Sequence, residues 1–164
     1  NNQEGGIEDN EWGYEYKSTV NENTLQNSFK KAVLELSNNN KVILIYPIPE
    51  VGWDINQKLY NRLPKKSPSR ERYLKPKNYI TTSYDVYKDR TKLSFELLDA
   101  IQDENIYRVY PHELFCNTTI KDRCLTHDNR NIFYADYSHP SLKGAEMINN
   151  KIIKKIEKIE LKSN

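Results

Sequence analysis

The run Val42-Ile-Leu-Ile-Tyr46 constrains the fold more than any other stretch of this 164-residue chain. Its consecutive apolar and aromatic residues predict a β-strand over residues 41–46, buried on both faces as in the centre of a parallel sheet. An amphipathic helix is predicted directly before it, over residues 22–37, because apolar residues recur there at intervals of three and four. A helix followed by a fully buried strand indicates the α/β class.

The remaining chain continues this alternation of helices and strands. The same patterns predict a short helix over residues 54–63, a long helix over 83–102 that Ser83 caps, strands over 106–110 and 132–135, and a last helix from Pro140 to about Leu161. Ligands of open α/β sheets gather at the carboxyl ends of the strands. We therefore expect residues 47–53, which follow the first strand, to border the functional site.

Composition sets limits on partners. The net charge is only +2, so it gives no reason to expect nucleic acid or an anionic membrane as a partner. The basic residues clustered between Lys65 and Lys77 could bind an anionic substrate, although such a run more often forms a solvent-exposed loop. No stretch approaches the roughly 18 apolar residues that would span a membrane. The chain begins with a polar Asn-Asn-Gln-Glu-Gly-Gly sequence rather than methionine, which leads us to expect a piece of a longer protein.

Cys116 and Cys124 are the two cysteines of the chain. Their even number and close spacing favour a disulfide and an oxidising compartment, while two free cytosolic thiols are the alternative. A zinc site would combine Cys116, Cys124, His127 and His139, but this spacing matches no standard pattern of zinc ligands. We therefore predict no metal site.

The candidate catalytic residues are Asp136 and His139. The apolar run before Asp136 predicts a strand end, and Pro140 after His139 predicts the first position of a helix. A histidine can act as a general base near neutral pH, and a carboxylate can fix its tautomer and orientation. The non-catalytic alternative is that His139 only caps the helix or lies on the surface.

No serine of the chain is a convincing nucleophile. Ser138 and Ser141 flank His139, but near neighbours on one turn are expected to point away from the ring. Neither follows a glycine-rich turn from strand to helix, and the chain contains no Gly-Asp-Ser or Gly-x-Ser-x-Gly sequence.

The block Asp136-Tyr-Ser-His139, followed by Pro-Ser-Leu-Lys-Gly-Ala, resembles the last block of the SGNH hydrolase superfamily. More closely, the chain resembles the C-terminal periplasmic SGNH domain of bacterial acyltransferase-3 proteins. Three further segments carry this resemblance in the same order along the chain, namely Asn2–Glu8, Val42–Glu50 and the loop from Phe115-Cys116 to Cys124.

The resemblance implies a three-layer α/β/α sandwich with a flavodoxin-like parallel sheet. Residues 1–164 would be the C-terminal portion of one such domain. His139 would activate a serine that lies upstream of this chain, and Asp136 would orient His139. The isolated chain would therefore be inactive, and its central strand would expose an unpaired edge.

The resemblance also implies partners and a location. A multi-helix membrane domain would deliver acyl groups, usually acetyl, and the SGNH domain would place them on hydroxyls of a surface glycan such as lipopolysaccharide. The parent protein would act at the periplasmic face of the bacterial inner membrane without a cofactor. Two alternatives are a free-standing SGNH carbohydrate esterase and a non-catalytic glycan-binding module, in which aromatic residues such as Trp12, Tyr14, Trp53 and Tyr137 would contact the sugar.

Overall fold

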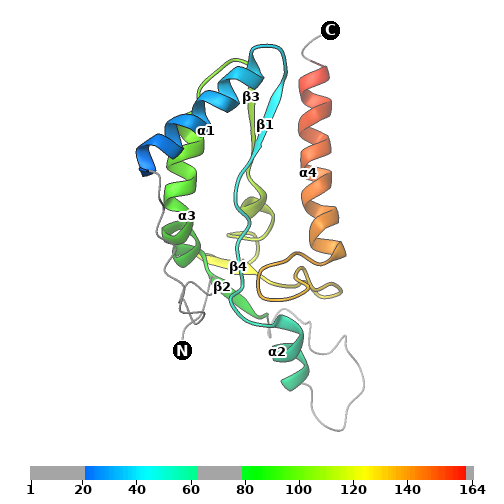
Figure 1. The fold of residues 1–164 in the computed structure, drawn as a ribbon. Helices are drawn as coiled ribbons and strands as arrows, with labels where there is room; N and C mark the ends of the chain where they lie inside the picture. Colours follow the sequence, from blue (N-terminus) through cyan, green and yellow to red (C-terminus); the bar gives the residue numbers. More distant parts are fainter. Residues whose placement is uncertain (1–20, 63–78, 162–164) are drawn as a thin grey trace.

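The computed structural model describes residues 21–62 and 79–161, and helices alternate with strands along them (Figure 1). The predicted α/β class is therefore confirmed. The elements are α1 (Glu22–Ser37), β1 (Val42–Ile45), α2 (Ile55–Asn61), β2 (Thr81–Ser83), α3 (Tyr84–Asp99), β3 (Ile106–Val109), the 3-10 helix η3 (Pro111–Leu114), β4 (Arg123–Leu125) and α4 (Leu142–Glu160). The segment Asn2–Glu8, the aromatic residues Trp12 and Tyr14, and the basic cluster from Lys65 to Lys77 lie outside the described residues.

The first sheet is a parallel pair of strands covered by helices on both faces. β1 pairs with β3 in a register that runs from Val42 opposite Ile106 to Ile45 opposite Val109. Helices α1 and α3 lie on one side of this pair and α4 on the other, which gives three layers (Figure 1). Parallel strands need a long crossover, and here the connection from β1 to β3 contains α2, β2 and α3.

Side chains cap the α-helix starts, as predicted for Ser83, and the start of the last helix requires a correction. The side chain of Asn21 accepts a hydrogen bond from the Asn23 amide at the start of α1, and Ser83 accepts from Val86 at the start of α3. The prediction that Pro140 occupies the first position of the last helix is wrong. Ser141 is the cap of α4 and accepts from the Gly144 amide, so Pro140 precedes the helix.

The outer edge of β1 is unpaired within the described residues, where β3 is its sole neighbour. Leu44 of this strand is buried, whereas the side chain of Ile45 is 49% exposed. Much of the apolar face of α1 is also exposed, at Leu25, Phe29 and Leu36. The predicted burial of the strand on both faces is therefore not reached within this part of the chain.

The predicted strand over residues 132–135 is wrong. The Phe133 amide donates to Thr126, while the Phe133 carbonyl accepts from Ser141, so its hydrogen bonds go to two separate segments. Ile132 and Tyr134 each form only an isolated bridge. The apolar run reflects burial instead, because Phe133 and Tyr134 lie in the hydrophobic core.

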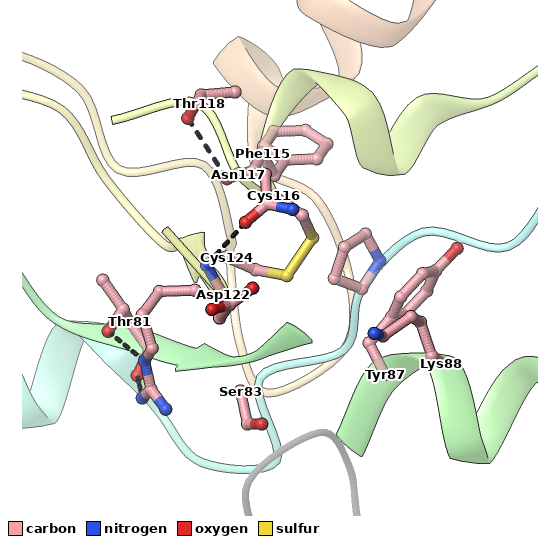
Figure 2. The surroundings of a disulfide bond; sticks show 12 residues. Thr81, Ser83, Tyr87, Lys88, Phe115, Cys116, Asn117, Thr118, Asp122 and Cys124 are labelled. Carbon is pink, nitrogen blue, oxygen red and sulfur yellow. Dashed lines mark hydrogen bonds between the residues drawn. A yellow bond between two sulfur atoms is a disulfide. The ribbon is translucent and has the colours of Figure 1, made fainter. Parts of the chain in front are cut away.

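A second, antiparallel pair of strands was not predicted. β2 pairs with β4 so that Thr82 lies opposite Cys124. The sulfur atoms of Cys116 and Cys124 lie 1.98 Å apart, at disulfide distance (Figure 2). Sulfurs that are bonded to each other are not thiolates, so this pairing removes two of the four ligands that the zinc alternative needs.

In the described part of the chain, no helix is both long enough and apolar enough to cross a lipid bilayer.

Candidate active site

Asp136 and His139 meet in the loop that precedes α4. Oδ2 of Asp136 lies 2.8 Å from Nδ1 of His139, and the histidine side chain is 73% exposed. Within the described residues, Nε2 of His139 makes no hydrogen bond. Because Nδ1–H donates to the carboxylate, Nε2 carries the lone pair and can accept a proton from a group that approaches from solvent.

The loop backbone keeps the Asp136 side chain ionised and in place. Its Oδ1 accepts hydrogen bonds from the amides of Ser138 and His139, both at 2.8 Å. These two backbone bonds, assisted by the His139 ring, lower the pKa of Asp136 to about 2. The carboxylate is therefore charged at neutral pH, which is the state that fixes the histidine tautomer.

The segment after β1 anchors this loop. The amides of Val51 and Gly52 both donate to the carbonyl oxygen of Tyr137, at 2.8 and 3.0 Å. Gly52 has a φ of 80°, a backbone conformation that favours glycine. The side chain of Asn56 in α2 adds a 2.9 Å bond to the Ala135 carbonyl. Residues 47–53, which were predicted to border the functional site, contact this loop through Val51 and Gly52.

The loop closes onto α4 through Ser141 and Gly144. The Ser141 hydroxyl donates to the Ile132 carbonyl at 2.6 Å and accepts from the Gly144 amide at 3.2 Å. A Cβ atom at Gly144 would lie 2.2 Å from the carbonyl oxygen of Phe133. Glycine is therefore required for this close contact between the helix and the chain before Asp136.

The two neighbouring serines are placed differently from each other. Ser141 serves as the helix cap, so its hydroxyl is already engaged. The Ser138 hydroxyl lies 3.4 Å from Nδ1 of His139, so it turns toward the ring rather than away as expected. This is the nitrogen that Asp136 engages, and Nε2, the base, is on the other side of the ring.

His127 is a buried structural residue, whereas the sequence analysis considered it only as a candidate zinc ligand. Its side chain is fully buried, and its Nε2 accepts a hydrogen bond from the Ile80 amide at 3.0 Å. Nδ1 lies 3.0 Å from the Asp128 carbonyl and donates to it in the neutral tautomer. Burial lowers the pKa of His127, so the ring stays neutral. The structure places it in the core, and not with His139.

Metal ligands are not gathered elsewhere in the described ranges either, where no three His, Cys, Asp or Glu side chains lie close enough to hold an ion.

Comparison with known families supplies the context for this pair. No curated protein and no solved structure matched the chain in the corresponding searches. A family model described as "SGNH domain (fused to AT3 domains)" matches residues 3–154, where AT3 denotes acyltransferase-3. A domain of the SGNH type indicates esterase or acyltransferase activity. Since the match extends over far more than half of the sequence, this chain belongs to the family of SGNH domains that are fused to AT3 domains.

Proposed function

We propose that this chain supplies the general base of an O-acyltransferase that moves acyl groups, typically acetyl, onto hydroxyls of a cell-surface polysaccharide or lipopolysaccharide. The observation that carries the proposal is the 2.8 Å contact between Asp136 and His139 in a chain of the AT3-fused SGNH family. The exposed His139 ring leaves room for both a nucleophile and an acceptor hydroxyl.

The first half-reaction forms an acyl-serine. A serine from outside these 164 residues attacks the carbonyl carbon of the acyl donor, and Nε2 of His139 accepts the serine proton. The bond between the acyl group and its carrier breaks, and His139 returns its proton to the departing carrier. Asp136 stabilises the imidazolium while it exists.

The second half-reaction transfers the acyl group to the sugar. His139 removes the proton of a sugar hydroxyl, whose oxygen attacks the acyl-serine. The serine leaves, recovers its proton from His139, and the sugar keeps the ester. This sequence of steps uses no cofactor. Water in place of the sugar would give the esterase reaction, so the acceptor decides between the two activities.

The proposed setting is the periplasmic face of the bacterial inner membrane. An AT3 membrane domain would deliver the acyl donor there, as the fusion of AT3 and SGNH domains in this family suggests. The bonded pair of Cys116 and Cys124 supports an oxidising compartment, because disulfides persist there.

The test uses the complete gene product in membranes, with a radiolabelled acyl donor and the surface polysaccharide of the source strain. His139→Ala should abolish transfer of label to the polysaccharide, while the matched neighbour Ser138→Ala should keep it. Label released as free acetate would favour the esterase alternative, and binding without any turnover would favour a glycan-binding module.

The isolated 164-residue chain provides a second test. We expect it not to hydrolyse p-nitrophenyl acetate, because the base alone cannot form an acyl-enzyme. Hydrolysis by this chain that His139→Ala abolishes would place the nucleophile within it and contradict this part of the proposal.

A further inference from the structure

Two pockets lie side by side along α3, and both are lined by Tyr87 and Thr91. The near pocket is the one lined by Pro47 and Glu50, next to the segment that holds the Asp136 loop. The far pocket is the one lined by His112. The near pocket has a volume of about 210 Å³ and the far pocket about 340 Å³. The larger value lies within the range of roughly 300–1,000 Å³ that is typical of small-molecule sites.

The near pocket adjoins the loop that holds Asp136 and His139. It is lined by Pro47 and Glu50 of the segment after β1. The residue after Glu50 is Val51, whose amide donates to the Tyr137 carbonyl at 2.8 Å. An extended residue advances the chain by at most about 3.6 Å, so the near pocket ends close to that loop.

The lining of the near pocket is rich in polar groups. The carboxylate of Glu50 lies 3.7 Å from the guanidinium of Arg90, and Thr91 and Ser94 add hydroxyl groups. A carboxylate and a guanidinium side by side accept and donate charge-assisted hydrogen bonds. Such a pair fits a ligand that carries adjacent hydroxyls.

The far pocket combines aromatic rings with charged side chains. The rings belong to Tyr84, Tyr87, Phe95 and His112, and the charged residues are Lys88, Lys92, Glu96 and Asp99. His112 packs against three of these rings, with centroid distances of 5.4–6.0 Å. Its Nδ1 is buried and has no hydrogen-bond partner within the described residues. Buried polar atoms are nearly always hydrogen-bonded, so His112 leaves an unsatisfied nitrogen in the wall of the far pocket.

Both pockets include residues from the edge of the sheet at which the strands end. η3, which carries His112, follows the carboxyl end of β3, and the Pro47–Glu50 segment follows the carboxyl end of β1. The hydroxyl of Tyr87 ties the two regions together through a 2.8 Å bond to the Pro47 carbonyl. The far pocket therefore adjoins the near pocket, and the near pocket adjoins the segment whose Val51 amide binds the loop of His139.

We propose that the near and far pockets are subsites for successive sugars of an extended glycan acceptor, which hold the chain while a hydroxyl of a further sugar reaches His139. This inference rests on the proposed function. A sugar ring has an apolar C–H face that packs on aromatic rings, and its hydroxyls both donate and accept hydrogen bonds. Its hydroxyls can therefore bond the Glu50 and Arg90 pair, while its C–H face packs on the rings of the far pocket.

The test measures acyl transfer by the complete gene product to two acceptors from the de-O-acetylated surface polysaccharide of the source strain. One acceptor is the long chain and the other is its single repeat unit. Ser94→Trp places a bulky side chain in the near pocket, and Tyr84→Ala removes one aromatic wall of the far pocket. Leu93→Trp is the matched control, because Leu93 is 65% exposed on the same helix and lines neither pocket.

We expect the wild-type protein to prefer the long chain, with a KM at least fivefold below that for the single repeat. Ser94→Trp and Tyr84→Ala should each raise the KM for the long chain at least fivefold with less than a twofold change in kcat. Leu93→Trp should keep the wild-type preference. Thermal melting checks the fold of each variant, and Ser94→Trp tests the inference alone if Tyr84→Ala does not fold.

Equal KM values for the two acceptors in the wild type would overturn the inference, as would a wild-type KM for the long chain in a folded Ser94→Trp variant. In both cases transfer that depends on His139 would leave the proposed function standing. Absence of any transfer or ester hydrolysis that depends on His139 would instead refute the proposed function and this inference with it.

Discussion

The carboxylate of Asp136 contacts His139 twice. Oδ2 meets the ring Nδ1 at 2.8 Å, and Oδ1 accepts from the His139 backbone amide at the same distance. The same side chain therefore fixes both the path of the loop and the tautomer of the base. Two substitutions can separate these tasks.

Asp136→Asn should preserve the conformation of the loop but impair His139 as a general base. The asparagine oxygen can still accept from the two backbone amides, but its NH₂ group cannot accept the Nδ1–H of His139. The ring then has no partner that favours a free Nε2 lone pair, and we expect kcat of the complete protein to fall by roughly 10³–10⁴-fold. Asp136→Ala should in addition lower the melting temperature. A fall in kcat of less than tenfold for Asp136→Asn would contradict the role of Asp136.

Gly144→Ala should destabilise the fold, although alanine is the better helix former. A Cβ atom would lie 2.2 Å from the Phe133 carbonyl oxygen, which is backbone and cannot turn aside. We expect the free energy of unfolding to fall by about 1–3 kcal/mol, as for other overpacked sites. Urea denaturation measures the change, with Leu142→Ala as control because the neighbouring Leu142 is 93% exposed. An unchanged or raised stability of Gly144→Ala would show that the helix can move away.

Acid should destabilise the protein through His127. Burial lowers the pKa of His127, and its Nε2 must stay unprotonated to accept from Ile80. The unfolded state therefore binds a proton more readily below the ordinary histidine pKa of about 6.5. The stabilising contribution is complete above that pH, and it is lost as the pH falls toward the lowered folded-state value, by at most about 1.4 kcal/mol per pH unit.

Urea denaturation between pH 7.5 and 5 measures this loss, and His127→Gln is the variant that tests its origin. Glutamine can still accept from Ile80 but does not titrate, so the pH dependence should become shallower. Burial also lowers the pKa of His112, so part of the slope should remain. The same slope in wild type and His127→Gln would exclude His127 as the source.

The long elements were predictable because their patterns are repeated over several turns. The helix predicted over residues 22–37 has those bounds in the structure, and the one predicted over 83–102 extends from Tyr84 to Asp99. The placement of Asp136 and His139 in one loop was also predictable, since only three positions separate them. The 2.8 Å contact between Oδ2 of Asp136 and Nδ1 of His139 could not be predicted, because it depends on the path of the loop backbone.

The errors concern short segments, in which tertiary contacts decide the outcome. Residues 132–135 are apolar because Phe133 and Tyr134 fill the core, and a strand has the same composition. β2 and β4 are three residues long each, and they pair across a wide gap in sequence. The buried His127 ring bonds the Ile80 amide, which is 47 positions away. The residues next to His127 therefore do not predict its burial.

Removing the disulfide should lower stability moderately. Cys116 and Cys124 are 8 positions apart, and closing so small a loop stabilises a fold by about 2–3 kcal/mol in the chain-entropy model. The double variant Cys116→Ala/Cys124→Ala, compared with the oxidised wild type in urea, measures the difference. Two free thiols in denatured protein purified from the periplasm would contradict the pairing.

The edge of β1 that is unpaired within the described residues should make the isolated chain self-associate. Exposed backbone groups of an edge strand form hydrogen bonds with another strand, and Ile45 adds an exposed apolar side chain. We expect the apparent mass in size-exclusion chromatography with light scattering to rise with concentration. Ile45→Lys should suppress this rise, whereas Leu93→Lys, on an exposed position of α3, should not. A wild-type chain that stays monomeric at high concentration would refute the prediction.

The two amides that hold the Tyr137 carbonyl lie a fixed number of residues after β1. Inserting or deleting one residue between Tyr46 and Glu50 would shift those amides by about 3.3–3.6 Å along the chain. The Tyr137 carbonyl would lose its partners or follow them, and His139, two positions later, would move with it. Natural variation in this segment should therefore replace one side chain with another and preserve its length, even where the residues themselves differ.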